Sequence, residues 1–360
     1  MPIRILHIVT YMGRGGLETM LMNYYRAINR NRIQFDFLTH RDFRADYDDE
    51  IEALGGRIYR LPNLNPFSRG YLGALDRFFA EHPEYRIVHS HLDCMSAIPL
   101  KAAKKHGVPV RIAHAHNSNQ PRDAKYLLKL FYKRLIARNA TQLFACSEEA
   151  GKWMFGDTIF RVLNNAIDAG KYAFDAGVRS TVRRELGLPA DALVVGHVGR
   201  FDSQKNHRFL VEIFEKMTVD AWLLLVGDGV LRPDVEQQAA TLGIRDRIIF
   251  TGVRTDVDRL LQAMDVFLMP SLFEGLPVSI VEAQAAGLPC LISDKVPIEC
   301  KKTDLITQLP LDASPAEWAE AVLAAAKQPR TDTLMQIREA GFDIRANAEW
   351  LQNYYLSFEV

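Results

Sequence analysis

The chain has 360 residues, of which 48% are hydrophobic, and its 44 basic and 44 acidic residues give a formal net charge of zero. This length suits two domains of ordinary size, and the balanced charge does not suggest nucleic acid as a partner. The four cysteines lack Cys-x-x-Cys spacing, which predicts free thiols in a reducing compartment rather than a zinc site or disulfides. The sequence shows no signal-peptide pattern and no apolar run of the ~18–20 residues that cross a membrane, so we expect a soluble cytoplasmic protein.

A glycine-rich turn separates the first predicted strand from the first predicted helix. Residues 4–10 form a short apolar run, Gly15 and Gly16 lie in the turn, and residues 17–28 follow at helical spacing. Such a turn lets backbone N–H groups approach a phosphate at the helix N-terminus, although ordinary turn chemistry explains the glycines about as well. The second strand, residues 35–39, ends without the acidic residue of a dinucleotide fingerprint, which argues against NAD.

Strands and helices continue to alternate through the first half of the chain, which predicts a doubly wound sheet. Two consecutive strands end in histidine pairs, His89 with His91 and His114 with His116. A lone histidine is usually structural, but the carboxyl ends of parallel strands meet at one edge, where ligands bind in open α/β sheets. The two pairs are therefore candidates for one functional crevice.

Residues 123–139 have the pattern of a basic amphipathic helix. Its apolar residues, Leu127 and Phe131 among them, are expected on one side, and its cations, including Lys129 and Arg134, recur mostly four residues apart. A surface helix with a core-facing side accounts for this pattern, and contact with an anionic membrane surface is the functional alternative.

The second half opens with a strand at residues 193–198, and two cations, Arg200 and Lys205, follow it ahead of a helix. Loop cations are mostly solvated, but an arginine fork and a lysine point charge beside a helix suit a diphosphate. Asp256 and Asp258 form an Asp-x-Asp motif that could suggest a metal site. Because the motif precedes a helix, a cap and first-turn role explains it better, and we predict no metal.

The most informative stretch, residues 270–289, joins a strand to a helix and carries Glu274 in the loop and Glu282 on the helix. A carboxylate in such a loop often only complements the helix N-terminus, and one on a helix is usually solvated. Here the helix is apolar nearly all round and should be buried, so Glu282 requires a partner. A ligand hydroxyl is one candidate for that partner.

This stretch, with Pro-Ser-x-x-Glu-Gly, two glutamates eight positions apart and Glu-Ala-x-Ala-x-Gly-x-Pro, resembles the donor-site signature of the retaining family 4 glycosyltransferases with the GT-B fold. The resemblance is greatest to members that build bacterial exopolysaccharide and capsule. Many relatives have Gly-Phe-Gly-Leu-Pro where this chain has Gly275-Leu276-Pro277. Further stretches that resemble family motifs follow one another in order at residues 15–18, 164–168, 199–205 and 251–254.

The resemblance implies an α/β protein of two Rossmann-like, doubly wound domains that face a central cleft. Residues 1–165 would form the acceptor domain, residues 166–342 the donor domain, and a C-terminal helix at about residues 343–360 would cross back to the first domain. The implied reaction moves a sugar from a nucleoside-diphosphate sugar, most simply a UDP-sugar, to an oligosaccharide or lipid-linked acceptor, without a metal or other cofactor. Peripheral contact with an anionic membrane would accompany such an acceptor.

The same resemblance implies roles for individual residues. A histidine after the second histidine-ending strand would contact the transferred sugar, with His116 favoured and His114 left open. Arg200 and Lys205 would neutralise the leaving diphosphate. The other donor-binding residues implied by the family motifs are Gly15, Gly16, Gly227, Val253, Arg254, Gly275 and Leu276.

The two glutamates are assigned in the same way, Glu274 to hydroxyls of the transferred sugar and Glu282 to those of the ribose. Two other functional classes fit the same scaffold: an epimerase or hydrolase that acts on the donor without an acceptor, and a sugar-nucleotide-binding protein without turnover. The presence of both carboxylates, both cations and the histidines argues against the binding protein.

Overall fold

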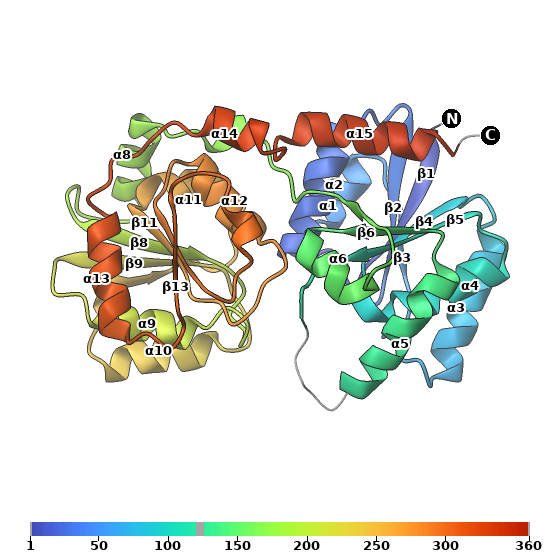
Figure 1. The fold of residues 1–360 in the computed structure, drawn as a ribbon, viewed down its shortest axis with the longest axis horizontal. Coiled ribbons are helices and arrows are strands. Elements are labelled where there is room, and N and C mark those ends of the chain that lie inside the picture. The colour runs from blue at the N-terminus through green and yellow to red at the C-terminus, as the bar shows by residue number, and fades with distance from the viewer. Residues whose placement is uncertain (1, 120–125, 359–360) are drawn as a thin grey trace. The chain divides into compact units, whose positions relative to one another are not determined.

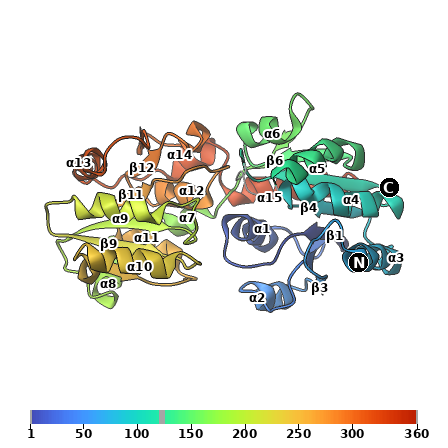
Figure 2. The same cartoon turned by 90° about the horizontal axis from the view of Figure 1, so that it is seen from below.

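The computed structural model describes residues 2–119 and 126–358, which form two compact units (Figure 1). The first unit is Met1–Ala166 with Ile344–Val360, and the second is Ile167–Asp343. Each unit is an open parallel β-sheet covered by helices (Figures 1 and 2), as the sequence predicts. Each junction lies one residue beyond the boundary expected from the sequence.

The first unit contains a seven-stranded sheet in the order β3-β2-β1-β4-β5-β6-β7. The strand order reverses between β1 and β4, and in doubly wound sheets a ligand crevice lies at the carboxyl ends of the strands at such a reversal. The strands are β1 (Ile3–Ile8), β2 (Ile33–Thr39), β3 (Ile58–Arg60), β4 (Ile87–Ser90), β5 (Val110–Ala115), β6 (Gln142–Ala145) and β7 (Arg161–Val162).

Helices connect these strands, and a last helix returns to the unit from the C-terminal end of the chain. They are α1 (Gly16–Ala27), α2 (Asp48–Ala53), α3 (Arg69–Glu81), the 3-10 helix η1 (Asp93–Ser96), α4 (Ala97–Lys105), α5 (Tyr126–Asn139), α6 (Glu148–Phe155) and α15 (Ile344–Leu356).

Burial on both faces explains the apolar sequence of the central strands. β2 is buried along its whole length, which is the continuous pattern of a strand in a parallel sheet covered on both sides. Its Phe35 and Phe37 are fully buried. Tyr25 of α1 stacks on Phe35 with ring centroids 5.2 Å apart, so α1 is fixed to this face by aromatic packing.

The C-terminal helix α15 belongs to the first unit, as expected, although the chain reaches it only after passing through the second. It packs along α1 and makes polar contacts with two strands. The Tyr354 hydroxyl donates to Gln142 Oε1 at 2.8 Å, and the buried Tyr355 hydroxyl lies 2.7 Å from His89 Nδ1.

The second unit contains a six-stranded sheet in the order β10-β9-β8-β11-β12-β13, which reverses between β8 and β11. Its core is formed by the central strands together with Trp318 and Val322 of the last long helix. The strands are β8 (Leu193–Val198), β9 (Ala221–Val226), β10 (Ile248–Phe250), β11 (Val266–Met269), β12 (Cys290–Ser293) and β13 (Ile306–Leu309).

Helices α9 and α10 lie on one side of this sheet and α11 and α12 on the other (Figure 1). The helices are α7 (Ala169–Tyr172), α8 (Ala176–Glu185), α9 (His207–Glu215), α10 (Arg232–Thr241), η2 (Arg245–Arg247), α11 (Val257–Ala263), α12 (Val278–Ala285), η3 (Ile298–Cys300), α13 (Pro315–Ala325) and α14 (Leu334–Glu339).

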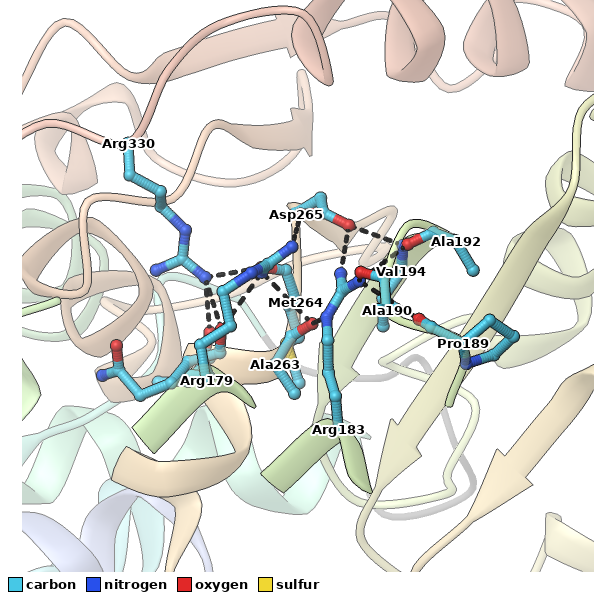
Figure 3. Close-up of polar contacts among 12 residues, drawn as sticks. Arg179, Arg183, Pro189, Ala190, Ala192, Val194, Ala263, Met264, Asp265 and Arg330 are labelled. Carbon is cyan, nitrogen blue, oxygen red and sulfur yellow. Dashed lines mark hydrogen bonds and ion pairs between the residues drawn. The ribbon is translucent and has the colours of Figure 1, made fainter. Parts of the chain in front are cut away.

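A cluster around Asp265 joins α8 to the strands of the second sheet (Figure 3). Arg179 Nη2 lies 2.6 Å from Asp265 Oδ1, and Arg183 Nη2 lies 2.6 Å from Asp265 Oδ2. The Val194 N–H donates to the same carboxylate at 2.8 Å. One carboxylate therefore links two turns of α8 to the start of β8.

Arginines of this cluster also bind main-chain carbonyls at the end of α11. Arg183 Nε donates to Ala263 O at 3.0 Å (Figure 3). Arg330 Nη2 donates to Leu261 O at 2.8 Å. Burial lowers the pKa of Arg183 and lowers that of Arg330 to about 9. Cations near a helix C-terminus satisfy its unpaired carbonyls, so these side chains hold the end of α11 in place.

Helix α5 corrects one expectation about the first unit. The interpretation of its apolar side as a core-facing side is wrong for Leu127 and Phe131, which are 78% and 56% exposed. The alternative, contact with a membrane surface, needs exposed apolar residues of this kind. They share one exposed face of the helix with Arg134 and Arg138, because positions spaced by three or four residues lie on one side. The expected start of this helix at residues 123–125 lies outside the described residues.

The four cysteines, Cys94, Cys146, Cys290 and Cys300, are buried free thiols, as predicted. None of the helices in the described part of the chain combines the length and apolar character needed to cross a membrane.

We predict that Asp265→Asn destabilises the protein by about 3 kcal/mol, because removing one partner of a largely buried ion pair leaves the other charge without compensation. Asp234→Asn is the matched control, since Asp234 pairs with Arg208 at 3.1 Å on the surface, where such pairs contribute about 0–1 kcal/mol. Denaturant unfolding of both variants measures the difference, and equal losses would contradict the importance of the Asp265 cluster.

Candidate active site

Three loops lie together at the carboxyl edge of the second sheet. The loop after β8 is hydrogen-bonded to the loop after β9, with Phe201 N donating to Asp228 O at 3.0 Å. The loop after β9 is in turn bonded to the loop after β10, with Gly227 N donating to Gly252 O at 2.9 Å. Within the second unit, the motifs at residues 199–205 and 251–254 are therefore brought together through the loop after β9.

Gly227 has a steric reason to be glycine. Its φ of 135° is a conformation that residues with a side chain rarely adopt. A Cβ added there would lie 2.1 Å from Gly199 O. Glycine thus allows the backbone after β9 to approach the residue that precedes Arg200.

The structure brings together Lys205 and Glu274, which are 69 residues apart in sequence. Lys205 Nζ lies 2.6 Å from Glu274 Oε1, and Gln204 Nε2 donates to Glu274 Oε2 at 3.1 Å. Glu274 is 4% exposed, so its carboxylate is a buried group held by a cation and an amide. Arg200 of the same loop is exposed.

Glu282 lies on α12 and is 5% exposed. The Tyr172 hydroxyl donates to its Oε1 at 2.7 Å. Burial raises the pKa of Glu282 to about 7, although the Tyr172 bond acts in the opposite direction. The sequence predicted a buried carboxylate that needs a partner, and the structure shows that Tyr172 is one such partner.

The other donor-site candidates of this unit lie in the loops around these groups. Val253 is 50% exposed. Gly275 and Leu276 are buried and lead into α12, whose N-cap Pro277 provides no side-chain cap. The first N–H groups of a helix have no partner within the helix, so this end of α12 can donate to an anion.

The Asp-x-Asp motif is occupied by cations of the chain itself. Arg254 makes two bonds to Asp256, at 2.8 Å and 2.7 Å, and these lower the pKa of Asp256. Lys171 Nζ lies 3.1 Å from Asp258 Oδ1. Asp256 does stand at the N-cap of α11, but its side chain makes no cap bond, so the capping explanation is wrong in detail.

Gly15 and Gly16 open α1 in the first unit. Gly15 is the N-cap residue in an extended conformation, with φ of −91°. A Cβ added at Gly16 would meet no atom within 4 Å. The surrounding protein therefore gives no steric reason for glycine at residue 16.

The two predicted histidine pairs do converge, and His7 of β1 joins them. His91 uses both ring nitrogens, with Nε2 3.0 Å from His7 Nδ1 and Nδ1 2.9 Å from His116 Nε2. His89 Nε2 lies 3.1 Å from His114 Nδ1. The five histidines and Tyr355 form two hydrogen-bonded chains. We call His7–His91–His116 the His91 chain and Tyr355–His89–His114 the His89 chain.

Both chains are largely buried. His7, His89, His91 and His114 are each at most 3% exposed, while His116 is half-buried. Burial lowers the pKa of His7 and of His116 to about 3, and lowers those of the other three well below their ordinary value. The rings are therefore neutral at pH 7, which is also the state of histidine that binds metals.

Two groups of three histidines have ring nitrogens within 4.8 Å of one another, His7–His89–His91 and His91–His114–His116. These are the sets of described side chains whose residue types and spacing suit a divalent cation.

Sequence reasoning missed four residues of these sites: Gln204, Tyr172, His7 and Tyr355. Gln204 lies inside a motif that was recognised, so its position gave a signal. The hydrogen bond between Tyr172 and Glu282 joins residues 110 positions apart in sequence, and the contact between Tyr355 and His89 joins residues 266 positions apart. No local sequence pattern indicates contacts at such separations.

Two family models and several known proteins match this chain. Residues 192–328 match the family described as "Glycosyl transferases group 1", and residues 15–156 match the "Glycosyl transferase 4-like domain". The putative glycosyltransferase EpsF of Bacillus subtilis (strain 168) is 36% identical, over 98% of this chain and 96% of that protein.

Two further proteins are similar to this chain. The UDP-Gal:alpha-D-GlcNAc-diphosphoundecaprenol alpha-1,3-galactosyltransferase of Escherichia coli is 31% identical, over 59% of this chain and 58% of its own. The crystal structure of Anabaena HepE in complex with UDP and glucose superposes with a TM-score of 0.82 at 20% identity, over 99% of this chain and 100% of that chain. The chain therefore belongs to the family 4 glycosyltransferases of the GT-B fold, and it is a glycosyltransferase.

Proposed function

We propose that this enzyme transfers a sugar from a UDP-sugar to a growing, lipid-linked oligosaccharide in exopolysaccharide or capsule biosynthesis, with retention of the anomeric configuration. The observation that carries the proposal is the buried Lys205–Glu274 pair, whose lysine lies in the same loop as Arg200. Its 2.6 Å contact joins a cation suited to a diphosphate with a carboxylate suited to sugar hydroxyls. The solved HepE complexes contain UDP and UDP-glucose, which supports uracil as the base of the donor.

The leaving diphosphate would be bound by Arg200, by Lys205 and by the uncapped end of α12. Such groups favour negative charge, and they stabilise a transition state in which charge builds on the leaving group. In the proposed reaction the bond from the anomeric carbon to the diphosphate oxygen breaks. The acceptor oxygen bonds to that carbon from the same face, and its proton passes to a diphosphate oxygen.

The hydroxyl groups of the donor would be bound by carboxylates. Glu274 would accept from the transferred sugar and Glu282 from the ribose. Gly15 and Gly16 are proposed to leave room for the ligand, since no described atom lies within 4 Å of a Cβ at residue 16.

Of the two candidate histidines, His116 is the one we propose to contact the transferred sugar. His114 Nδ1 is bonded to His89, and its Nε2 is buried without a hydrogen-bond partner. His116 Nε2 is hydrogen-bonded to His91, so a ligand would contact Nδ1 of the half-buried His116. Because its pKa is lowered to about 3, His116 would act as a neutral hydrogen-bonding group.

The lipid-linked acceptor is supported by the name of the E. coli relative, which includes a diphosphoundecaprenol acceptor. It is also supported by the exposed face of α5, which combines Leu127 and Phe131 with Arg134 and Arg138. A helix face with exposed apolar and basic residues is typical of binding at an anionic membrane surface.

We predict that UDP-glucose or another UDP-sugar raises the melting temperature, because a ligand of the folded state stabilises by mass action. Arg200→Ala should weaken binding by about tenfold to a hundredfold, since hydrogen bonds to charged groups contribute about 1.5–3 kcal/mol. Arg208→Ala is the control, as its side chain is 62% exposed and paired with Asp234. EDTA should change neither result, and the absence of a shift with UDP-, GDP- and ADP-sugars would contradict the proposed donor.

We predict that affinity for a UDP-sugar rises with pH across the range around 7. The pKa of Glu282 is about 7, and the ionised carboxylate is the stronger acceptor for ribose hydroxyls. Tyr172→Phe removes a bond that lowers this pKa, so the midpoint should move to higher pH. Titration calorimetry with UDP-glucose measures the profile. Glu282→Gln should bind more weakly and without this pH dependence, and an unchanged profile in Glu282→Gln would exclude Glu282 as its source.

We predict that the enzyme sediments with anionic liposomes through α5. Arg134→Gln with Arg138→Gln should weaken binding by about fivefold per arginine, as a basic residue near such a surface contributes about 1 kcal/mol. Leu127→Ser with Phe131→Ser should also weaken it. Val230→Ser changes a side chain that is 86% exposed on the second unit and serves as the control. Equal sedimentation of all variants would exclude α5 as the membrane contact.

A further inference from the structure

The His91 chain connects a half-buried histidine to the interior of the first unit. It begins at His116, passes through both nitrogens of His91 and ends at His7 of β1. His7 Nε2 is buried without a hydrogen-bond partner, and the His7 ring lies 4.2 Å from that of Phe35, centroid to centroid. The chain therefore has one end in the apolar core and one end that a ligand can reach.

Neutral rings give such a chain a direction. A neutral imidazole has one N–H and one bare nitrogen, so His91 must donate to one neighbour and accept from the other. Either His7 donates to His91 and His91 to His116, or both bonds run the opposite way. The first direction leaves a bare nitrogen at His7 Nε2, and the second leaves an N–H there.

The buried end decides between the two directions. Buried N–H groups without an acceptor are rarer in proteins than acceptors with an unused lone pair. The first direction is therefore favoured, with protons on His7 Nδ1 and His91 Nδ1. His116 then accepts at Nε2 and carries its own proton on Nδ1, the nitrogen that points away from the chain.

The backbone of His116 is fixed as well. The His116 N–H donates to Asp93 Oδ1 at 2.8 Å, and Asn117 Nδ2 donates to Asp93 Oδ2 at 2.9 Å. Asp93 has a φ of 45°, a left-handed conformation that aspartate tolerates better than most residues. The ring and the backbone of His116 are thus held by different neighbours, His91 and Asp93.

We propose that His91 is a positioning residue which, supported by His7, holds His116 in the Nδ1–H tautomer, so that His116 presents a hydrogen-bond donor to an oxygen of the transferred sugar. This inference rests on the proposed contact between His116 and the sugar. The His89 chain does not set a donor in this way, because either direction leaves a buried N–H or O–H at one of its ends.

A divalent cation is the competing occupant of these nitrogens. It would have to displace the protons shared at 2.9 Å and 3.0 Å in the His91 chain. Both candidate groups consist of neutral histidines only, so no carboxylate of either group would offset the charge of a buried cation. The hydrogen-bonded chain accounts for the short contacts without such a charge.

The test replaces His91 and measures two quantities, kcat and the tautomer of His116. His91→Leu removes the bond to His116, and kcat should fall about tenfold to a hundredfold, by analogy with the loss of an outer hydrogen-bond partner of a metal-bound histidine. The affinity for UDP should stay within about twofold, because UDP lacks the sugar that His116 is proposed to contact. A loss in kcat without a loss of affinity is the pattern of an interaction made in the transition state. His91→Asn retains an amide near the Nδ1 position and should recover most of the activity.

His40→Leu is the matched control. His40 is also a buried histidine of the first unit, bonded to Val9 O and to the Tyr71 hydroxyl, but it belongs to neither chain. It should lose stability and keep kcat. A loss of kcat in His40→Leu equal to that in His91→Leu would assign the effect to general destabilisation and overturn the proposal.

Nitrogen-15 NMR of histidine-labelled enzyme reads the tautomer directly. The expected spectrum places the proton of His116 on Nδ1 in the wild type and shows a mixture of tautomers in His91→Leu. A proton on Nε2 of His116, or stoichiometric binding of Zn²⁺ that is lost in His91→Leu, would overturn the proposal. If His116→Ala retains full activity, the assigned sugar contact fails, whereas loss of activity in His116→Ala with none in His91→Leu refutes the positioning role alone.

Discussion

Polar groups buried at the carboxyl edge of a parallel sheet must have partners, and this constraint determines how both sites of the enzyme are built. Glu274 is held by Lys205 and Gln204, and Glu282 by Tyr172. The histidines of the first unit are held largely by one another. Both carboxylates and His116 are thus part of a bonded pair or chain, which fixes their orientation before a ligand arrives.

The sequence predicted the elements of the fold because their signals are local. Apolar runs followed by turn residues located the strands. The position of each candidate residue in the sequence then shows which strand it follows. Both glutamates, both cations and four of the five clustered histidines were found in this way. His7 was missed because one histidine within an apolar strand has the pattern of a core residue, and only the register of β1 beside β4 brings it to His89.

The incorrect expectations arose where a local pattern was interpreted as a contact. A core-facing side was one of the two interpretations of the apolar residues of α5, but Leu127 and Phe131 are exposed, since apolar residues also contribute much of a protein surface. Asp256 was expected to cap α11, yet Arg254 two residues earlier binds its carboxylate instead. A pattern identifies which residues can interact, whereas the partner that is nearest and best oriented is set by the tertiary structure.

The two cations of the second unit, Arg200 and Lys205, differ in their partners within the protein. Lys205 is already paired with Glu274 at 2.6 Å, so together they contribute little net charge to the loop. Arg200 is exposed and forms no ion pair within the described residues, so it can supply positive charge to a diphosphate without first losing a partner. Besides its proposed contact with the diphosphate, Lys205 pairs with Glu274. Without Lys205, a buried carboxylate would lose its cation, at a cost in free energy to folding and to the binding of an anionic ligand.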